Sequence, residues 1–219
     1  MLKAVIKFVV ALFISPVAVA VTAAFYGNLR QVGEFASSLN FFLFGIVAYM
    51  ILHLLFYKPT FLYVLGHEAV HAGISWIFGG KVKSFKASKD GGSVQTDKTN
   101  FIIELGPYFV PVYAIIITIV YFVLVSSYNI NGSTFIFLIG FALAFHVIST
   151  IEVMKVRQPD IVKSGYFFSV ILVYILNIIV VAMIFALVFP SFSAKKFFVD
   201  SFIVTRNIYM TVVGQLFCV

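Results

Sequence analysis

TFLYVLGHEAVHAGISWIF, residues 60–78, places an H-E-x-x-H motif in the middle of an apolar run. Residues four apart share one face of an α-helix, so His67 and His71 can hold one metal ion between them. Glu68 projects beside them and is placed to activate a water molecule that the metal polarises. The motif is typical of metalloproteases, and its apolar flanks predict that this chemistry takes place within a membrane.

The composition predicts a polytopic membrane protein. The chain has 219 residues, of which 62% are hydrophobic and only 11% are charged. A soluble domain of this size does not bury that much apolar surface. The formal net charge of +7 fits cytoplasmic loops and anionic lipid headgroups. Nucleic acid is a poor candidate partner, because the lysines lie in short loops between the apolar segments.

The apolar segments predict an all-α membrane protein with about six transmembrane helices. The expected spans cover residues 4–25, 39–57, 60–78, 100–125, 134–153 and 165–189. The tail, residues 191–219, favours an interfacial helix over a seventh span because polar residues interrupt it. We expect a single membrane domain, with two accessory spans in residues 1–58, a core in 59–190 and the tail after it.

The one long polar segment, residues 79–99, predicts a short β-hairpin after the motif helix. Apolar residues alternate with polar ones on either side of the turn sequence Asp90-Gly91-Gly92. In the next span, Gly106-Pro107 and Pro111 predict a kinked helix whose freed backbone groups face a cavity.

The distribution of positive charge predicts the orientation. If spans alternate, the polar links at 26–38 and 154–164 share a membrane face with the hairpin. This face carries nine lysines and arginines against six on the other, so the positive-inside rule places it in the cytoplasm. We expect an integral, multi-pass protein of the cytoplasmic membrane of a prokaryote, with its active site towards the cytoplasmic face.

A catalytic zinc ion usually takes three protein ligands and a water molecule, so the motif needs a third ligand. The candidates are Asp160, His146, Glu104 and Glu152. Asp160 lies at the same membrane depth as the two histidines, although an aspartate at a helix start can equally be an N-cap. His146 could bind the metal, donate a hydrogen bond to a ligand, stabilise an oxyanion or join two helices by a hydrogen bond. Glu104 could face the cavity or cap the kinked helix.

Several features together resemble the site-2 protease family of intramembrane zinc metalloproteases. They are the motif at residues 65–71, the glycine pairs Gly79-Gly80 and Gly91-Gly92 around a hairpin, and Asp160 at the start of a later span. The resemblance covers residues 60–189. It implies a helix with the motif, a membrane-associated hairpin and an aspartate ligand on a downstream helix.

By this resemblance His67, His71 and Asp160 would bind Zn²⁺, and Glu68 would be the general base. The family's aspartate usually lies in an Asn-Pro-x-Asp-Gly or Leu-Asp-Gly context. This chain reads Gln-Pro-Asp-Ile at residues 158–161, which imitates the Asn-Pro pair only in part.

The sequence therefore predicts a membrane-embedded zinc metalloendopeptidase that cleaves membrane proteins or peptides in or near the bilayer. Asn100 and the Gly106-Pro107 kink are candidates for a polar cleft that admits water. Two alternatives stay open: a non-catalytic membrane metal-binding protein or transporter in which Glu68 is dispensable, and an inactive protease-like scaffold. A nearer alternative is another membrane zinc protease in which Glu104 or Glu152 is the third ligand.

Overall fold

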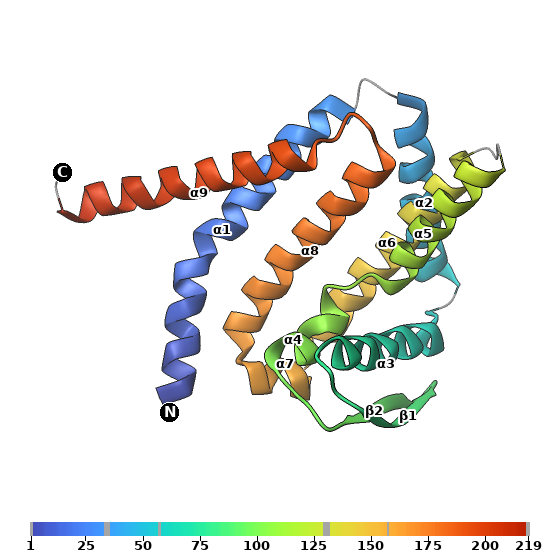
Figure 1. The fold of residues 1–219 in the computed structure, drawn as a ribbon, viewed down its shortest axis with the longest axis horizontal. Coiled ribbons are helices and arrows are strands. Elements are labelled where there is room, and N and C mark those ends of the chain that lie inside the picture. Colours follow the sequence, from blue (N-terminus) through green and yellow to red (C-terminus); the bar gives the residue numbers. More distant parts are fainter. Residues whose placement is uncertain (1, 33–35, 57, 129–131, 157, 218–219) are drawn as a thin grey trace. The chain divides into compact units, whose positions relative to one another are not determined.

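The computed structural model describes residues 2–32, 36–56, 58–128, 132–156 and 158–217. These residues form nine α-helices, one 3₁₀ turn and one two-stranded hairpin (Figure 1). In chain order they are α1 Leu2–Val32, α2 Ala36–Leu55, α3 Thr60–Ile77, β1 Val82–Ser88, β2 Gly91–Thr96, α4 Phe101–Leu105, η1 Gly106–Tyr108, α5 Val112–Ser127, α6 Ser133–Met154, α7 Pro159–Ser164, α8 Tyr166–Val188 and α9 Ala194–Phe217. The expected helical fold with a hairpin after the motif helix is confirmed.

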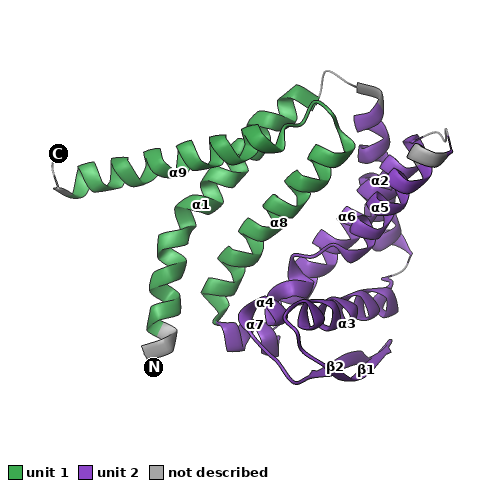
Figure 2. Cartoon of the chain, in the orientation of Figure 1, with its two compact units in different colours: residues 1–36, 165–219 green, residues 37–164 purple. Residues whose placement is uncertain are grey.

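The chain divides into two compact units (Figure 2). Residues 1–36 and 165–219 form the first unit, in which α1 packs against both α8 and α9. Residues 37–164 form the second unit, which contains the hairpin, helices α3 to α7 and all candidate site residues. The core expected over residues 59–190 crosses the boundary between these units.

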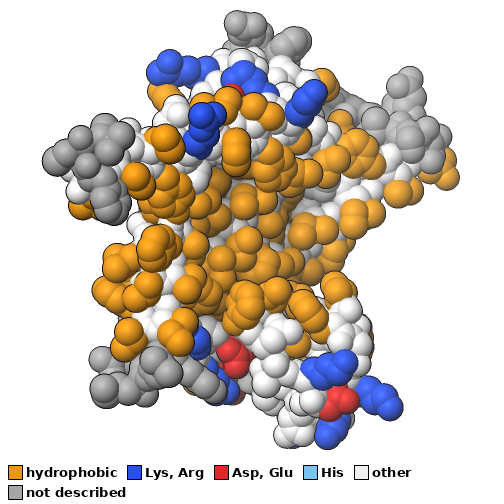
Figure 3. All heavy atoms as spheres, turned by 60° about the vertical axis from the view of Figure 1, so that its left-hand side comes forward, with side chains coloured by type: hydrophobic (Ala, Val, Ile, Leu, Met, Phe, Trp, Pro, Cys, Tyr) orange, Lys and Arg blue, Asp and Glu red, His pale blue; other side chains and the backbone are white. Residues whose placement is uncertain are grey.

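Four of the described helices are long and apolar enough to cross a membrane. They are Val5–Val32, Ser38–Leu55, Ser133–Met154 and Tyr166–Val188. A fifth span results if the bent pair Phe101–Tyr108 and Val112–Leu124 crosses as one. Hydrophobic side chains cover much of the face in Figure 3. The six expected spans are not confirmed, because α3, expected to span as residues 60–78, falls outside this set of described helices.

The polar link expected at residues 26–38 is largely helical, which corrects the sequence prediction. Helix α1 continues to Val32, and residues 33–35 lie outside the described chain. Arg30 donates a 3.2 Å hydrogen bond to the hydroxyl of Tyr26, and its guanidinium lies 4.7 Å from that ring's centroid. Because this pair is four residues apart, its polar groups are satisfied on the surface of the helix.

Helix α3 carries the motif and ends where the hairpin begins. Gly79 has a φ of +70°, a conformation that glycine adopts without steric cost and that turns the chain out of the helix. The Lys98 ammonium donates a 3.0 Å hydrogen bond to the carbonyl of Phe78, and a cation is favourable at a helix C-terminus. In Figure 1 α3 runs crosswise to α6 and packs on both strands, α4, η1 and the start of α5.

The hairpin is antiparallel, as predicted, but its turn differs from the expected one. Ser88 pairs with Gly91, so Lys89 and Asp90 form the turn and the two glycines begin β2. Gly92 is needed for a close approach, since a Cβ atom there would lie only 2.6 Å from Cγ of Glu68. Strand β2 therefore lies directly against the motif helix.

The proline-rich segment is bent more sharply than the expected kink. Helix α4 passes into the turn η1, and α5 begins after Pro111. The second half is bent by 74° away from the direction of the first. Pro107 and Pro111 have no backbone N–H to continue a helix, so the chain changes direction here and places α4 beside the motif.

Candidate metal centre

The motif face of α3 carries a row of hydrogen-bonded side chains. Tyr63, His67 and His71 follow one another at intervals of four residues, so they stack on one face. The Tyr63 hydroxyl lies 3.2 Å from Nδ1 of His67, and Nε2 of His67 lies 3.2 Å from Nε2 of His71. Nδ1 of His71 lies 2.8 Å from the carbonyl oxygen of Ile103 in α4.

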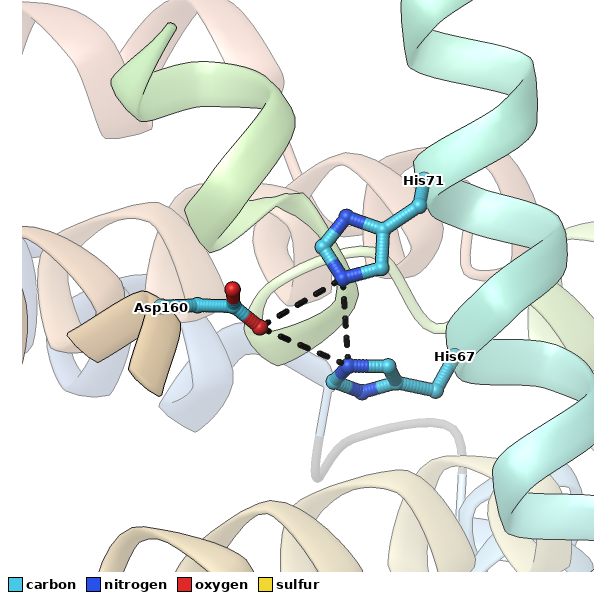
Figure 4. Close-up of side chains that lie close together, drawn as sticks. All are labelled: His67, His71 and Asp160. Atoms are coloured by element: carbon cyan, nitrogen blue, oxygen red, sulfur yellow. Dashed lines mark hydrogen bonds and ion pairs between the residues drawn. The ribbon is translucent and has the colours of Figure 1, made fainter. Parts of the chain in front are cut away.

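Asp160, at the start of α7, completes the cluster (Figure 4). Its Oδ2 atom lies 4.0 Å from Nε2 of His67 and 3.6 Å from Nε2 of His71. Two ligands about 2.1 Å from one zinc ion are at most about 4.2 Å apart. All three separations are within that limit, so the cluster is spaced for one ion. Among the described residues it is the only group of three possible ligands this close together.

The Asp160 carboxylate is in the form that binds metal. Burial raises the pKa of this carboxyl, but the hydrogen bond and positive charge of His71 oppose that effect, and the pKa lies below its ordinary value. Asp160 is therefore ionised at neutral pH, as a metal ligand must be.

Helix α4 fixes the orientation of His71. A carbonyl oxygen only accepts hydrogen bonds, so Nδ1 of His71 carries a proton and Nε2 points towards the cluster. Asn100 caps α4, since its side-chain oxygen accepts hydrogen bonds of 2.9 Å from the amides of Ile102 and Ile103. Asn100 thus acts as a helix cap next to the carbonyl that holds His71.

A cleft of about 730 Å³ opens beside the cluster. One wall is the edge of β2, residues 92–96, and another is formed by residues 158–160. His67, Glu68 and His71 also line the cleft. Glu68 is buried and lies beside Gly92 of β2, so its carboxylate is shielded from bulk solvent while it lines this cleft.

Glu104 lines the same cleft but lies outside the group of three ligands. Its Oε2 accepts a 2.7 Å hydrogen bond from the hydroxyl of Ser164, and its Oε1 accepts one of 3.3 Å from Thr99. Glu104, a candidate ligand in the sequence, thus forms a hydrogen bond that connects α4 to the end of α7.

His146 is separated from the three ligand atoms. It shares with Tyr63 and His67 the lining of a cavity of about 20 Å³, which is enough room for one water molecule. His146 therefore lies near the ring of His67, across the small cavity that both residues line.

Glu152 belongs to a different cluster, where α2 and α6 end. Its Oε1 atom lies 2.5 Å from Nζ of Lys58 and 3.2 Å from Nε2 of His53. The hydroxyl of Tyr49 lies 3.1 Å from Nδ1 of the same histidine. Glu152 therefore pairs with Lys58 and His53. It is not part of the candidate metal site.

Three supporting groups were missed in the sequence analysis. Tyr63 had a detectable signal, because it precedes His67 by one helical turn. The carbonyl of Ile103 and the hydroxyl of Ser164 gave none, since their partners are 32 and 60 residues away.

Comparisons with known proteins gave no match. No family model matches the chain, no curated protein matches it, and no solved structure matches it. The resemblance drawn from the motif stays a prediction, and the case for a function rests on the geometry of the cluster.

Proposed function

We propose that the protein is a zinc metalloendopeptidase of the site-2 protease type that cleaves membrane proteins in or near the bilayer. One observation carries the proposal: Asp160, from a distant helix, lies within 4.0 Å of Nε2 of both His67 and His71. The chain has helices long and apolar enough to cross a membrane, and ionisable residues near such helices are seldom without a function.

The residues present fit a catalytic zinc site in their chemistry. Two imidazole nitrogens and one carboxylate oxygen are ligands that zinc accepts, and three protein ligands leave a position open for water. The hydrogen bond from His71 to Ile103 leaves Nε2 free to bind. An outer hydrogen bond of this kind is the usual support of a metal-binding histidine.

Glu68 is the residue that would move the proton. A zinc ion held by the cluster would supply Lewis acidity and lower the pKa of a water molecule. Glu68 would take a proton from the attacking water and deliver it to the leaving amine, the role of a general base and then a general acid. Glu68 is buried beside Gly92 and lines the cleft, where such a proton would be exchanged.

The edge of β2 is the proposed docking site for an extended substrate. Within the described chain β2 pairs only with β1, so its other edge is open to accept a strand. Residues 92–96 line the cleft that also contains Glu68 and Asp160. A substrate segment added to this edge would present its peptide bonds to the cluster by β-strand addition.

The proposal is tested with protein purified from a zinc-replete host and incubated with labelled single-span membrane peptides. We expect one zinc ion per chain, its loss in His67→Ala and His71→Ala, and weaker binding in Asp160→Ala. Cleavage should stop when a chelator removes the metal and return when zinc is added. A zinc-free wild type, or cleavage that persists in chelator, would overturn the proposal.

A further inference from the structure

Helix α3 begins beside the place where α2 and α6 end. Nζ of Lys58, just before α3, lies 2.5 Å from a carboxylate oxygen of Glu152. Nε2 of His53, near the end of α2, lies 3.2 Å from the same oxygen. Glu152 is in the last turn of α6, and α2 and α6 are both candidate membrane spans. The start of α3 therefore lies at the membrane face where these two spans end.

The second half of α3 is held at the same face. Nε2 of His71 lies 3.6 Å from Oδ2 of Asp160, at the start of α7. Asp160 follows Glu152 by only eight residues. An extended chain of that length reaches at most about 29 Å, which is less than the hydrocarbon core of about 30 Å. This stretch also contains helical turns and is shorter still, so Glu152 and Asp160 share one membrane face.

The hairpin lies alongside α3 and does not continue beyond its end. Both strands contact α3. A Cβ atom at Gly92 would lie 2.7 Å from Cγ1 of Val64, in the first half of the helix. Lys89 and Asp90, in the turn next to Gly92, are exposed. If α3 crossed the bilayer, it would draw these charged residues into the hydrocarbon core, where ionisable groups are costly.

Positive charge in residues 37–164 is confined to this face. The lysines in the described part of this unit are Lys58, Lys81, Lys83, Lys86, Lys89, Lys98, Lys155 and Lys163. At the opposite ends of α2, α5 and α6, residues 36–40 and 125–135 contain no lysine or arginine in the sequence. By the positive-inside rule, the face that carries α3 and the hairpin is cytoplasmic. A crossing α3 would instead put Lys58 on the other face.

The end of α3 exposes apolar side chains next to these lysines. Trp76 and Ile77 are 63% and 82% exposed, and Lys81 follows them in the chain. Tryptophan is enriched where membrane meets water, and lysine is attracted to anionic headgroups. A second copy of the chain would bring like charges together on this surface, so an anionic lipid leaflet is the better partner.

We propose that α3 and the hairpin lie on the cytoplasmic surface of the membrane, where their lysines bind anionic phospholipid headgroups and Trp76 and Ile77 enter the leaflet. Helix α3, which runs crosswise to α6 (Figure 1), then begins and ends on one face and does not span as residues 60–78. This arrangement requires neither a metal ion nor hydrolysis. One consequence rests on the proposed function: a substrate is cleaved at the cytoplasmic end of its span.

Cysteine labelling tests whether α3 crosses the membrane. The single native cysteine, Cys218, is replaced by serine. One cysteine is then introduced at an exposed position: Thr60→Cys at the start of α3, Asp90→Cys in the hairpin turn or Thr134→Cys at the start of α6. A membrane-impermeant maleimide should label the first two variants only in inverted vesicles and the third only in intact cells.

Three results of this labelling would overturn the proposal. The first is labelling of Thr60→Cys and Asp90→Cys from opposite faces, which would show that α3 crosses. The second is labelling of both variants in intact cells, which would place the hairpin outside. The third is a Thr60→Cys variant that reacts in detergent but in neither membrane preparation, which would place the start of α3 inside the bilayer.

A second measurement tests the lipid partner with purified protein in vesicles. Trp76 is the only tryptophan, so its fluorescence reports this surface alone. Exchange of phosphatidylcholine for phosphatidylglycerol should shift its emission to shorter wavelength and slow hydrogen exchange of the hairpin. The slowing should be about fivefold for each lysine that binds a headgroup. The double variant Lys86→Gln/Lys89→Gln should reduce both effects, whereas Lys195→Gln/Lys196→Gln, in α9, removes equal charge and should not.

The same response in both lipids, or equal effects of the two double variants, would overturn the lipid partner. A dimer that forms in both lipids and buries Trp76 would identify a second copy as the partner instead. Neither experiment uses metal or substrate. A wild type that binds no zinc would therefore overturn the proposed function and leave this inference standing.

Discussion

The carboxylate of Glu104 accepts a 2.7 Å hydrogen bond from the hydroxyl of Ser164, and this bond joins α4 to the end of α7. The two short helices pack on each other, and each supports one member of the His67-His71-Asp160 cluster. Helix α4 holds His71 through the carbonyl of Ile103, and α7 carries Asp160. This hydrogen bond therefore helps to set the separation between His71 and Asp160, which come from the two sides of the cleft.

Glu104→Ala should weaken zinc binding about tenfold, because α7 loses the hydrogen bond that connects it to α4. Ser164→Ala should have a similar effect, and the double variant should be no weaker than Glu104→Ala, since both changes remove one hydrogen bond. Chelator competition measures all three affinities. If Glu104 were itself the third ligand, Ser164→Ala would leave zinc binding intact and Asp160→Ala would not reduce it.

Glu152→Gln should leave the zinc content unchanged. Its partners are Lys58 and His53, in the other histidine cluster. We expect only a small loss of thermal stability, about 1 kcal/mol or less, as for other partly exposed ion pairs. Loss of zinc in this variant would instead identify Glu152 as a ligand.

Gly92→Ala should displace the hairpin from α3. A Cβ atom would lie 2.6 Å from Cγ of Glu68 and 2.7 Å from Cγ1 of Val64, and overpacking of this kind costs about 1–3 kcal/mol. Cleavage should fall while zinc stays bound, because the ligands do not contact Gly92 directly. Hydrogen exchange of the hairpin and metal analysis report the two effects.

Gly73→Ala is the matched control for that change. Gly73 lies in α3, the helix that Gly92 contacts, and a Cβ atom at Gly73 meets nothing within 4 Å. Alanine is favoured over glycine in a helix by about 0.5–1 kcal/mol, so this variant should be as stable as the wild type or more so. Equal damage from both substitutions would show that the close approach at Gly92 is unimportant.

Asp97 should make the stability of the hairpin dependent on pH. The amide of Lys81 donates a 2.6 Å hydrogen bond to its carboxylate, and this bond, with the charges of nearby lysines, lowers the pKa of Asp97 below its ordinary value of 3.8. A lowered pKa means that the stabilisation is present at neutral pH and is lost as the pH falls below about 4. Hydrogen-exchange protection of the hairpin should follow this course. Asp97→Asn should weaken protection at neutral pH, and Asp90→Asn, in the turn, should not.

The sequence was sufficient to predict the main helices, the hairpin and the proximity of His67, His71 and Asp160. The i, i+4 spacing of His67 and His71 determines that they share a helix face wherever that helix lies. The proximity of Asp160 followed from counting spans and from the family resemblance. Alternation of apolar residues on either side of two glycines was enough to predict the hairpin.

Other features depend on contacts that a single sequence does not reveal. Polar residues after Tyr26 predicted a loop between two spans. Arg30 and Tyr26 instead form a hydrogen bond along the surface of the helix, and α1 continues to Val32. The 74° bend before α5 depends on how α4 packs against α3, which the prolines permit but do not determine. The hydrogen bond between Glu104 and Ser164 joins residues that are 60 positions apart in the chain, so no local sequence pattern could predict it.

The central claim is most directly tested by Glu68→Gln, a change that keeps the size of the side chain but removes the proton-accepting carboxylate. We predict that this variant binds one zinc ion per chain as the wild type does, while its cleavage of membrane peptides falls by about 10²- to 10⁴-fold, the usual contribution of a general base. Cleavage at the wild-type rate by the zinc-loaded variant would contradict the proposed role of Glu68 and would favour a metal-binding protein without hydrolysis at this site.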